Sequence, residues 1–398
     1  MEFLLAILVL LLFAKLFGEF LHHFGFSSLI GEVAVGIIFG PALLGWIVIP
    51  AAGEPIAATA EAIRGVAMLG LIVLMLVAGM NSRFDMLMKV RFKALVIAVS
   101  GMAVSFALGF GVAYTWTQQI LPSLFVAAAL SNTATEIVTR FTERSRFRHL
   151  MVGAALIDDI IAVYVLGILS TAVVRGGVFD LDMIIWATIG IVVFFVLIGY
   201  LSRKLIIKAD IMKKLWRFER RGVPLAFALC LALALALIAR YIGLHEIIGA
   251  YVAGLFIGRL RERPDALLLS RIRLNAILED ARVALQAILT PMFFVFVGLT
   301  FAPNWGQVDI FLIFALVVAA FAGKLIGCGA GAAAVGYKRR ELVEIGTAMC
   351  SRGSLELAVL QFGLLSGIVS PELFAVMVVV TLTTTLLTPV FFKFVSKG

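Results

Sequence analysis

Charged residues are scarce in this chain of 398 residues: they make up 14% of it, whereas 63% of its residues are hydrophobic. Soluble domains average about 25% charged and roughly 45–50% apolar residues. Polar side chains this few cannot cover a water-facing surface, so the composition excludes a soluble globular protein. Lipid is the solvent that fits, because a helix of about 20 apolar residues crosses the hydrocarbon core of a bilayer.

Signatures of cofactor, metal or enzyme chemistry are also missing. The three cysteines (Cys230, Cys328 and Cys350) lie in apolar segments, without the spacing of a metal site or a disulfide framework. No nucleophile and base form a catalytic pattern, so we expect neither an enzyme nor a cofactor. The glycine-rich run at 327–331 is similar to a nucleotide loop, but it follows no strand and lies within an apolar span. Close helix packing explains it better.

Long apolar segments recur along the whole chain. They predict an all-α integral membrane protein with about thirteen transmembrane helices, at 2–17, 28–46, 62–80, 94–115, 119–139, 149–174, 183–202, 222–240, 244–260, 283–300, 308–334, 342–366 and 371–392. No basic region precedes the first segment, so we expect a retained helix and not a cleaved signal peptide.

The basic residues are distributed unevenly between the two sides of this predicted bundle. The loops after helices 3, 5, 7, 9 and 11 and the C-terminal segment share one side, and they hold 27 of the 33 Lys and Arg residues. Basic loops stay in the cytoplasm. We therefore expect the N-terminus outside and the C-terminus inside, at the plasma membrane. The net charge of +9 is explained by a cytoplasmic rim, and no nucleic-acid partner is expected.

Glycine spacing indicates an internal repeat. The stretch LIGEVAVGIIFG at 29–40 aligns with IIGAYVAGLFIG at 247–258. Gly79 in LMLVAGM at 74–80 aligns with Gly298 in FVFVGLT at 294–300. The offsets are 218 and 219, and seven helices separate the partners, which reverses their orientation. The prediction is a single transporter unit over 1–398, with a first inverted repeat at 1–180, a linker helix and basic loop at 181–221, and a second repeat at 222–398. Inverted repeats are typical of secondary transporters.

Polar clusters interrupt two apolar segments at corresponding places, in predicted helices 5 and 12. These clusters predict broken helices, whose freed backbone groups can coordinate ions. The candidate residues are Ser131, Asn132, Thr133, Thr135 and Glu136 in the first, and Ser351 and Arg352 in the second.

Ionisable residues inside the membrane are costly, so each is a functional candidate. Asp158 and Asp159 lie in mid-helix, about 100° apart around the axis. Lys324 lies in predicted helix 11, within reach of helix 6, and can pair with one of the two aspartates. The other would then remain free to titrate. The alternative is that these charges only brace the bundle.

Several motifs in order resemble the cation:proton antiporter-2 family: GEVAVGIIFGPALLGW, LIVLMLVAGM, LIDDIIA, TPMFFVFVGL, GKLIG and SRG. The resemblance implies a dimerisation domain and a mobile core domain, made of helices 4–6 and 11–13 with two crossed broken helices. It also implies a homodimer and electrogenic exchange, with Asp159 as the carrier and Asp158 paired to Lys324. Relatives often have Glu after Arg-Gly, where this chain has Ser354.

The function predicted from these residues is antiport of protons against sodium or lithium by alternating access. Asp159 is the shared site for Na⁺ and the proton, and Thr133 is a further oxygen ligand. Potassium/proton exchange is the alternative within transport. Sodium-coupled uptake of an organic solute and a passive channel are less favoured, because no substrate cavity or filter motif can be read.

Overall fold

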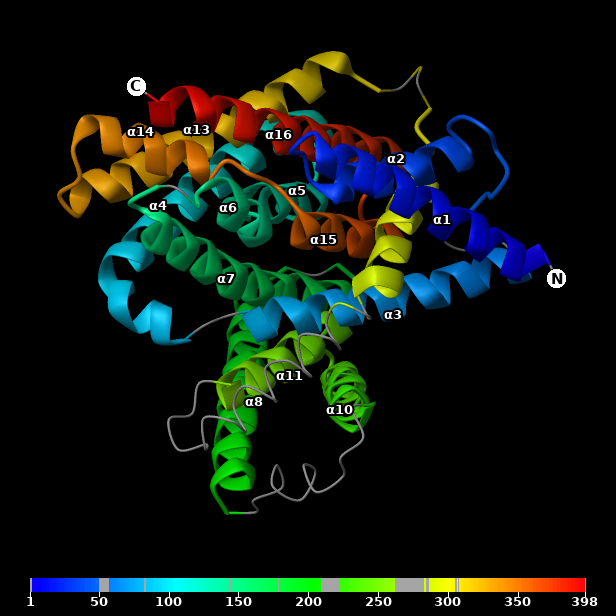
Figure 1. Cartoon of the computed structure of the whole chain (residues 1–398), viewed down its shortest axis with the longest axis horizontal. Helices are drawn as coiled ribbons and strands as arrows, with labels where there is room; N and C mark the ends of the chain where they lie inside the picture. Colours follow the sequence, from blue (N-terminus) through cyan, green and yellow to red (C-terminus); the bar gives the residue numbers. More distant parts are fainter. Residues whose placement is uncertain are drawn as a thin grey trace. The chain divides into compact units, whose positions relative to one another are not determined.

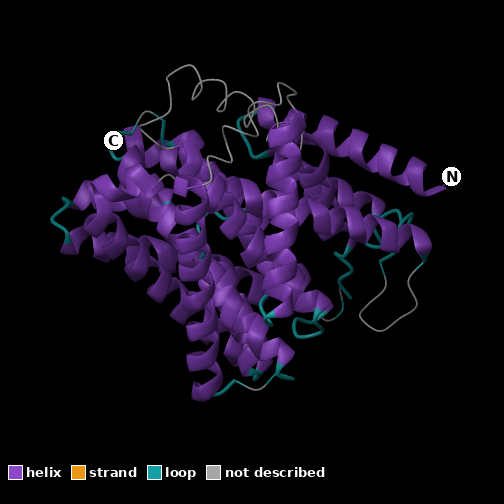
Figure 2. Ribbon diagram, turned by 90° about the horizontal axis from the view of Figure 1, so that it is seen from below, coloured by secondary structure: helices purple, strands orange, loops and turns teal. Residues whose placement is uncertain are grey.

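The computed structural model describes residues 2–49, 57–81, 84–143, 145–177, 179–208, 222–261, 283, 286–304, 306 and 308–397. Within these ranges every regular element is a helix, as Figure 2 shows. The helices are α1 (Glu2–His23), α2 (Ser28–Phe39), α3 (Ala58–Asn81), α4 (Phe84–Thr117), α5 (Ile120–Ser131), α6 (Thr135–Phe141), α7 (Arg148–Val174), α8 (Leu181–Lys208), α10 (Gly222–Tyr241), α11 (Glu246–Arg261), α13 (Ile310–Ala334), α14 (Arg339–Ala348), α15 (Ser354–Leu365) and α16 (Pro371–Lys397). A further apolar helix covers Gln286–Leu299.

Each of the thirteen predicted segments overlaps helical residues. Among the described residues, seven helices have the length and apolar composition needed to cross a membrane, and six apolar helices are shorter. The number of spans stays a prediction. Much of the two predicted basic loops, at 209–221 and 262–282, lies outside the described residues.

Several predicted boundaries are wrong: α4, for example, begins at Phe84, ten residues before the predicted start at 94. The segment at 28–46 was expected to be helical throughout, but α2 ends at Phe39. Gly40 is extended, with φ −78° and ψ −176°, and Pro41 follows it. A residue before proline is driven out of the helical region, so the helix ends there.

The chain forms two compact units. Unit 1 contains Met1–Gly65, Met86–Val165 and Phe294–Gly398, and unit 2 contains Val66–Asp85 and Leu166–Phe293. In unit 1, α5 contacts α15, and α13 contacts both α14 and α16. Figure 1 shows α5, α6 and α15 beside one another, although α15 lies more than 200 residues further along the chain.

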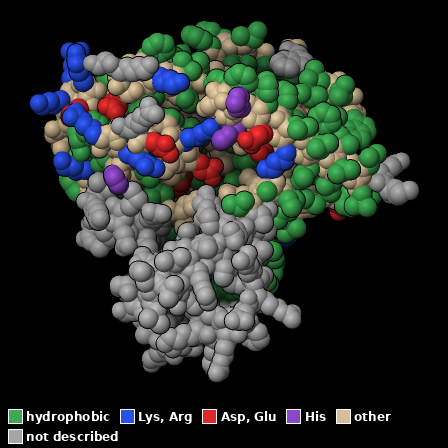
Figure 3. All heavy atoms as spheres, viewed as in Figure 1, with side chains coloured by type: hydrophobic (Ala, Val, Ile, Leu, Met, Phe, Trp, Pro, Cys, Tyr) green, Lys and Arg blue, Asp and Glu red, His purple; other side chains and the backbone are tan. Residues whose placement is uncertain are grey.

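Large hydrophobic side chains are exposed on several helices of unit 1. Leu4 and Leu8 of α1 are 67% and 63% exposed, and Phe311 and Phe314 of α13 are 66% and 65% exposed. The face in Figure 3 shows broad areas of such side chains. An apolar surface of this kind would be unfavourable in water and is what lipid contact requires.

Two helix crossings are built on glycine pairs, one in each unit. In unit 1 a Cβ atom on Gly36 of α2 would lie 2.7 Å from the Cα of Gly298. In unit 2 a Cβ atom on Gly254 of α11 would lie 2.8 Å from the Cα of Gly79 in α3. Only glycine permits backbones to approach this closely. The four glycines are those that the sequence aligns in pairs, so corresponding positions make corresponding contacts.

A second pair of contacts follows the same correspondence. Gly31 of α2 packs on the backbone of Phe17 in α1, and Gly249 of α11 packs on the backbone of Leu235 in α10. Phe17 and Leu235 are 218 positions apart, which is the offset between Gly31 and Gly249.

The glycine crossings predict a sharp difference between two Gly→Ala substitutions. We expect Gly36→Ala to lower the melting temperature of the purified protein by several degrees, because the new methyl group meets the backbone of the neighbouring helix. Gly65→Ala in α3 is the control: its Cβ would have no neighbour within 4 Å, and alanine favours helix by about 1 kcal/mol. Thermal unfolding in detergent measures both. Equal melting temperatures for the two variants would contradict the close crossing.

Candidate functional site

Two breaks in helical structure meet inside unit 1. The chain is extended between α5 and α6, at Asn132–Ala134, and again between α14 and α15, at Ser351–Gly353. The amide of Ala134 donates a hydrogen bond to the carbonyl of Ser351 at 3.0 Å, which joins the two extended stretches. A Cβ atom on Gly353 would lie 2.6 Å from the Cβ of Ala134, so glycine is needed for this approach.

The first buried carboxylate of the site is paired. Asp158 of α7 is fully buried, and its Oδ2 atom forms an ion pair with Nζ of Lys324 in α13. The Thr133 hydroxyl lies 2.7 Å from the same oxygen and 3.1 Å from the Met349 carbonyl. Asp158 is thus held by the first break and by α13 together. Its Oδ1 atom has no hydrogen-bond partner among the described residues.

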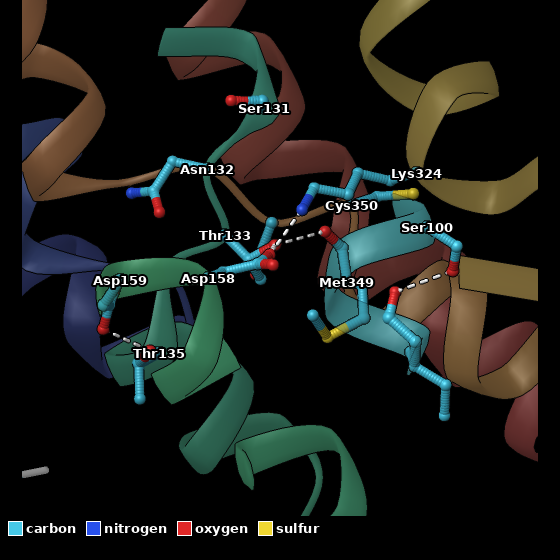
Figure 4. A network of polar contacts seen from close by, with 12 residues as sticks. Ser100, Ser131, Asn132, Thr133, Thr135, Asp158, Asp159, Lys324, Met349 and Cys350 are labelled. Carbon is cyan, nitrogen blue, oxygen red and sulfur yellow. Dashed lines mark hydrogen bonds and ion pairs between the residues drawn. The ribbon is translucent and has the colours of Figure 1, made fainter. Parts of the chain in front are cut away.

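The neighbouring carboxylate is in a different setting. Asp159 is 9% exposed and accepts a hydrogen bond of 2.7 Å from the hydroxyl of Thr135, in the first turn of α6. Among the described residues, no cation lies within ion-pair distance of it. Figure 4 shows the two aspartates pointing apart, Asp158 toward Thr133 and Lys324 and Asp159 toward Thr135. The step of about 100° between consecutive helical residues explains the divergence.

Arg352 connects the two breaks. It is fully buried and donates hydrogen bonds to the carbonyl of Asn132 in the first break and, at 3.0 Å, to the carbonyl of Ala320 in α13. Its own carbonyl accepts a hydrogen bond of 2.9 Å from the hydroxyl of Thr385 in α16. Among the described residues, the hydrogen bonds of the Arg352 side chain are thus all to backbone carbonyls.

The remaining candidate residues lie at the edge of this arrangement. The hydroxyls of Ser131 and Ser351 bond to carbonyls of their own helices, those of Ala128 and Ala348. Glu136 is exposed. The site therefore brings together Thr133, Asp158 and Lys324 on one side and Thr135 and Asp159 on the other.

Sequence reasoning missed the contribution of α16. Thr381 donates a hydrogen bond of 2.9 Å to the carboxylate of Glu356, and Thr385 bonds to the Arg352 carbonyl. Both threonines are buried. The signal was present as TLTTTLLT at 381–388, a run of threonines unusual for an apolar span.

Comparison with known proteins agrees with this arrangement. The family described as "Sodium/hydrogen exchanger, transmembrane" matches residues 7–397. The chain belongs to the sodium/hydrogen exchanger family. It is therefore a multi-pass membrane protein of a family of secondary transporters, which confirms that it is not an enzyme and that the cation:proton antiporter resemblance is right.

Two curated relatives match the chain over nearly its whole length. The "Na(+)/H(+)-K(+) antiporter GerN" of Bacillus cereus is 28% identical, over 99% of this chain and 96% of the relative. The "High-affinity Na(+)/H(+) antiporter NhaS3" of Synechocystis is 26% identical, over 99% and 90% respectively.

A solved structure shares the fold. The sodium proton antiporter MjNhaP1 from Methanocaldococcus jannaschii superimposes with a TM-score of 0.71, at 16% identity, and 99% of this chain and 96% of that chain are covered. The predicted all-α antiporter fold is confirmed.

Proposed function

We propose that this exchanger family member moves Na⁺ or Li⁺ against protons across the membrane, with Asp159 as the site that the ion and the proton share. The observation that carries the proposal is the contrast between two adjacent buried carboxylates. Asp158 has Lys324 as its counter-charge, whereas Asp159 has only the Thr135 hydroxyl as a described hydrogen-bond partner. A buried carboxylate without a paired cation favours binding of a proton or a cation.

The chemistry of the neighbouring groups suits a small alkali cation. Hard cations take oxygen ligands, and carboxylate, hydroxyl and backbone carbonyl oxygens all occur at the break beside Asp159. Na⁺ is cargo here, since it crosses the membrane, and is not a resident cofactor. We propose that Thr133 contributes an oxygen, while Lys324 and Arg352 hold the surrounding backbone in place.

Potassium is the second candidate ion, because the name of the relative GerN includes K⁺ as well as Na⁺. The deciding experiment reconstitutes the protein in liposomes and follows internal pH with a dye. We expect alkali-driven proton movement with sodium and lithium, and none with choline. Proton movement with potassium alone would show that K⁺, and not Na⁺, is the substrate. No response to any alkali cation would overturn the proposed exchange.

We further propose that residues 1–180 and 222–398 are inverted repeats joined by 181–221. The paired glycine contacts support this, because aligned residues of the two halves make equivalent contacts. We propose α4–α7 and α13–α16 as the mobile core domain and the remaining helices as the dimerisation domain of a homodimer. Most of α4–α7 and all of α13–α16 lie in unit 1, together with α1 and α2.

The orientation proposed for the plasma membrane can be tested by cysteine labelling. Cys230 is exposed, whereas Cys328 and Cys350 are buried. The substitution Cys230→Ala therefore removes the native cysteine that a labelling reagent could reach. In this variant we place Glu143→Cys, in the connection between α6 and α7, and Arg175→Cys, after α7. Both positions are exposed.

Basic loops remain in the cytoplasm, and the connection at 142–147 belongs to the basic side. We therefore expect an impermeant maleimide to label Arg175→Cys in intact cells and to label Glu143→Cys only after the cells are opened. The reverse pattern would overturn the orientation.

A further inference from the structure

Arg352 is a buried cation whose charge the site described above does not balance. Its hydrogen-bond acceptors, the carbonyls of Asn132 and Ala320, are dipoles and carry no net charge. Its Nε atom has no hydrogen-bond partner, and among the described residues no carboxylate lies within ion-pair distance. Lys324, the other fully buried cation, has Asp158. A lone charge in a low-dielectric interior is costly, so a counter-charge for Arg352 is expected nearby.

Glu356 is a buried acid that the exchange mechanism does not use. It lies in the first turn of α15, one helical turn beyond Arg352, and is fully buried. One carboxylate oxygen accepts the hydrogen bond from Thr381, and the other, Oε2, has no partner among the described residues. The side chains of Glu356 and Arg352 interact electrostatically.

Helix α16 donates a hydrogen bond to each of these two residues. Thr381 and Thr385 are four residues apart and therefore lie on one face of the helix. Thr381 bonds to the Glu356 side chain and Thr385 to the Arg352 carbonyl. One donor nitrogen on Arg352 and one acceptor oxygen on Glu356 remain without partners, and they are opposite in charge.

We propose that Glu356 is the counter-charge of Arg352 and a positioning residue for the ion site. With Arg352 balanced by Glu356 and Lys324 by Asp158, Asp159 is the only unbalanced carboxylate among the residues of the two breaks and α7. The site is then neutral when Asp159 holds either a proton or a monovalent cation. This inference rests on the proposed exchange function.

The counter-charge role gives a specific kinetic signature. Glu356→Gln keeps the size of the side chain but leaves Arg352, which bonds to the first break at Asn132, as an unbalanced positive charge in the site. That charge repels a cation, so we expect the KM for sodium to rise roughly tenfold, with a much smaller change in kcat. Arg352→Gln combined with Glu356→Gln removes both charges, so we expect its KM to be lower than that of Glu356→Gln. It should stay above the wild-type value, because the hydrogen bonds of Arg352 to the carbonyls of Asn132 and Ala320 are lost.

Thr381→Val is the matched control. It removes the hydrogen bond to Glu356 without changing any charge. We expect its KM to stay within about twofold of wild type, because Glu356 keeps its charge and still balances Arg352. A KM increase in Thr381→Val equal to that in Glu356→Gln would show that Glu356 acts as a structural brace, and would overturn the proposal.

The double variant separates the remaining outcomes. Transport by the double variant that is no better than that of Glu356→Gln overturns the counter-charge role, and complete loss in both would mean that Glu356 itself carries the ion. If Glu356→Gln fails to fold, the proposal requires that the double variant folds, which size-exclusion chromatography and thermal unfolding measure. A wild-type protein that moves no protons with sodium would instead refute the exchange function on which the inference rests.

Discussion

Asp159→Asn is expected to abolish sodium-driven proton movement while the protein still inserts and folds. Asparagine has nearly the shape of aspartate but can neither release a proton nor offer a negative charge to a cation. The Thr135 hydroxyl can still bond to the amide oxygen, so the local hydrogen bond is kept. Dye-monitored flux in proteoliposomes measures transport, and melting in detergent measures folding. We expect a loss to background, without a large drop in melting temperature.

The control for this substitution is Asp180→Asn, which makes the same chemical change at an exposed position. Asp180 accepts a hydrogen bond of 2.7 Å from the amide of Met183 at the start of α8. Asparagine caps helices about as well as aspartate, so transport should be unchanged. Near-normal exchange by a folded Asp159→Asn protein would remove Asp159 from the mechanism.

Lys324→Gln is expected to remove most of the voltage dependence of transport. If only Asp159 exchanged its proton, one proton would move for one cation and no net charge would cross. If a cation at Asp159 also disrupts the pair between Asp158 and Lys324, and that disruption releases a second proton from the site, the balance changes. Two protons then move for each cation. One net charge is worth about 2.3 kcal/mol per 100 mV, or roughly a fiftyfold change in the ion gradient.

The measurement imposes a membrane potential on proteoliposomes without a pH gradient and follows sodium. Wild-type sodium flux should follow the sign and size of the potential, and the flux of Lys324→Gln should not. Breaking one side of a buried ion pair costs about 3–5 kcal/mol, so the variant should also melt earlier. Lys393→Gln at an exposed position of α16 is the control. Wild-type flux that ignores the potential would establish electroneutral exchange, and unchanged voltage dependence in Lys324→Gln would leave that lysine as a brace.

The helices could be predicted from the sequence because their signal is local. An apolar run of sufficient length has few alternatives in lipid, and every predicted segment overlaps helical residues. The end of α2 was missed because Gly40 and Pro41 lie in an otherwise apolar stretch. The sequence stays hydrophobic there, although the helix cannot continue through these two residues. Both polar interruptions, around Asn132 and Arg352, were found because polar residues inside apolar runs are rare.

The partners within the site could not be predicted as well. Two adjacent aspartates look alike in sequence, and the rotation of α7 decides which of them reaches Lys324, so the pairing of Asp158 with Lys324 was indicated by the family resemblance and not by the residues themselves. The hydrogen-bond acceptors of Arg352 are the backbone carbonyls of Asn132 and Ala320. Because every residue has a carbonyl, the sequence does not indicate which carbonyls accept these bonds. The roles assigned to Asp159 and Thr133 remain predictions that the experiments above test.

The glycine crossings described earlier also have a meaning in terms of subunit assembly. In a dimer of identical subunits, residue i of one subunit meets residue j of the other, and j meets i in return. The contacts of Gly36 with Gly298 and of Gly254 with Gly79 have this reciprocal form, although all four glycines belong to one chain. These reciprocal contacts support the inverted repeats proposed above. Unlike the positions of a homodimer, however, these four can change one at a time, so each is restricted to glycine by its own close contact.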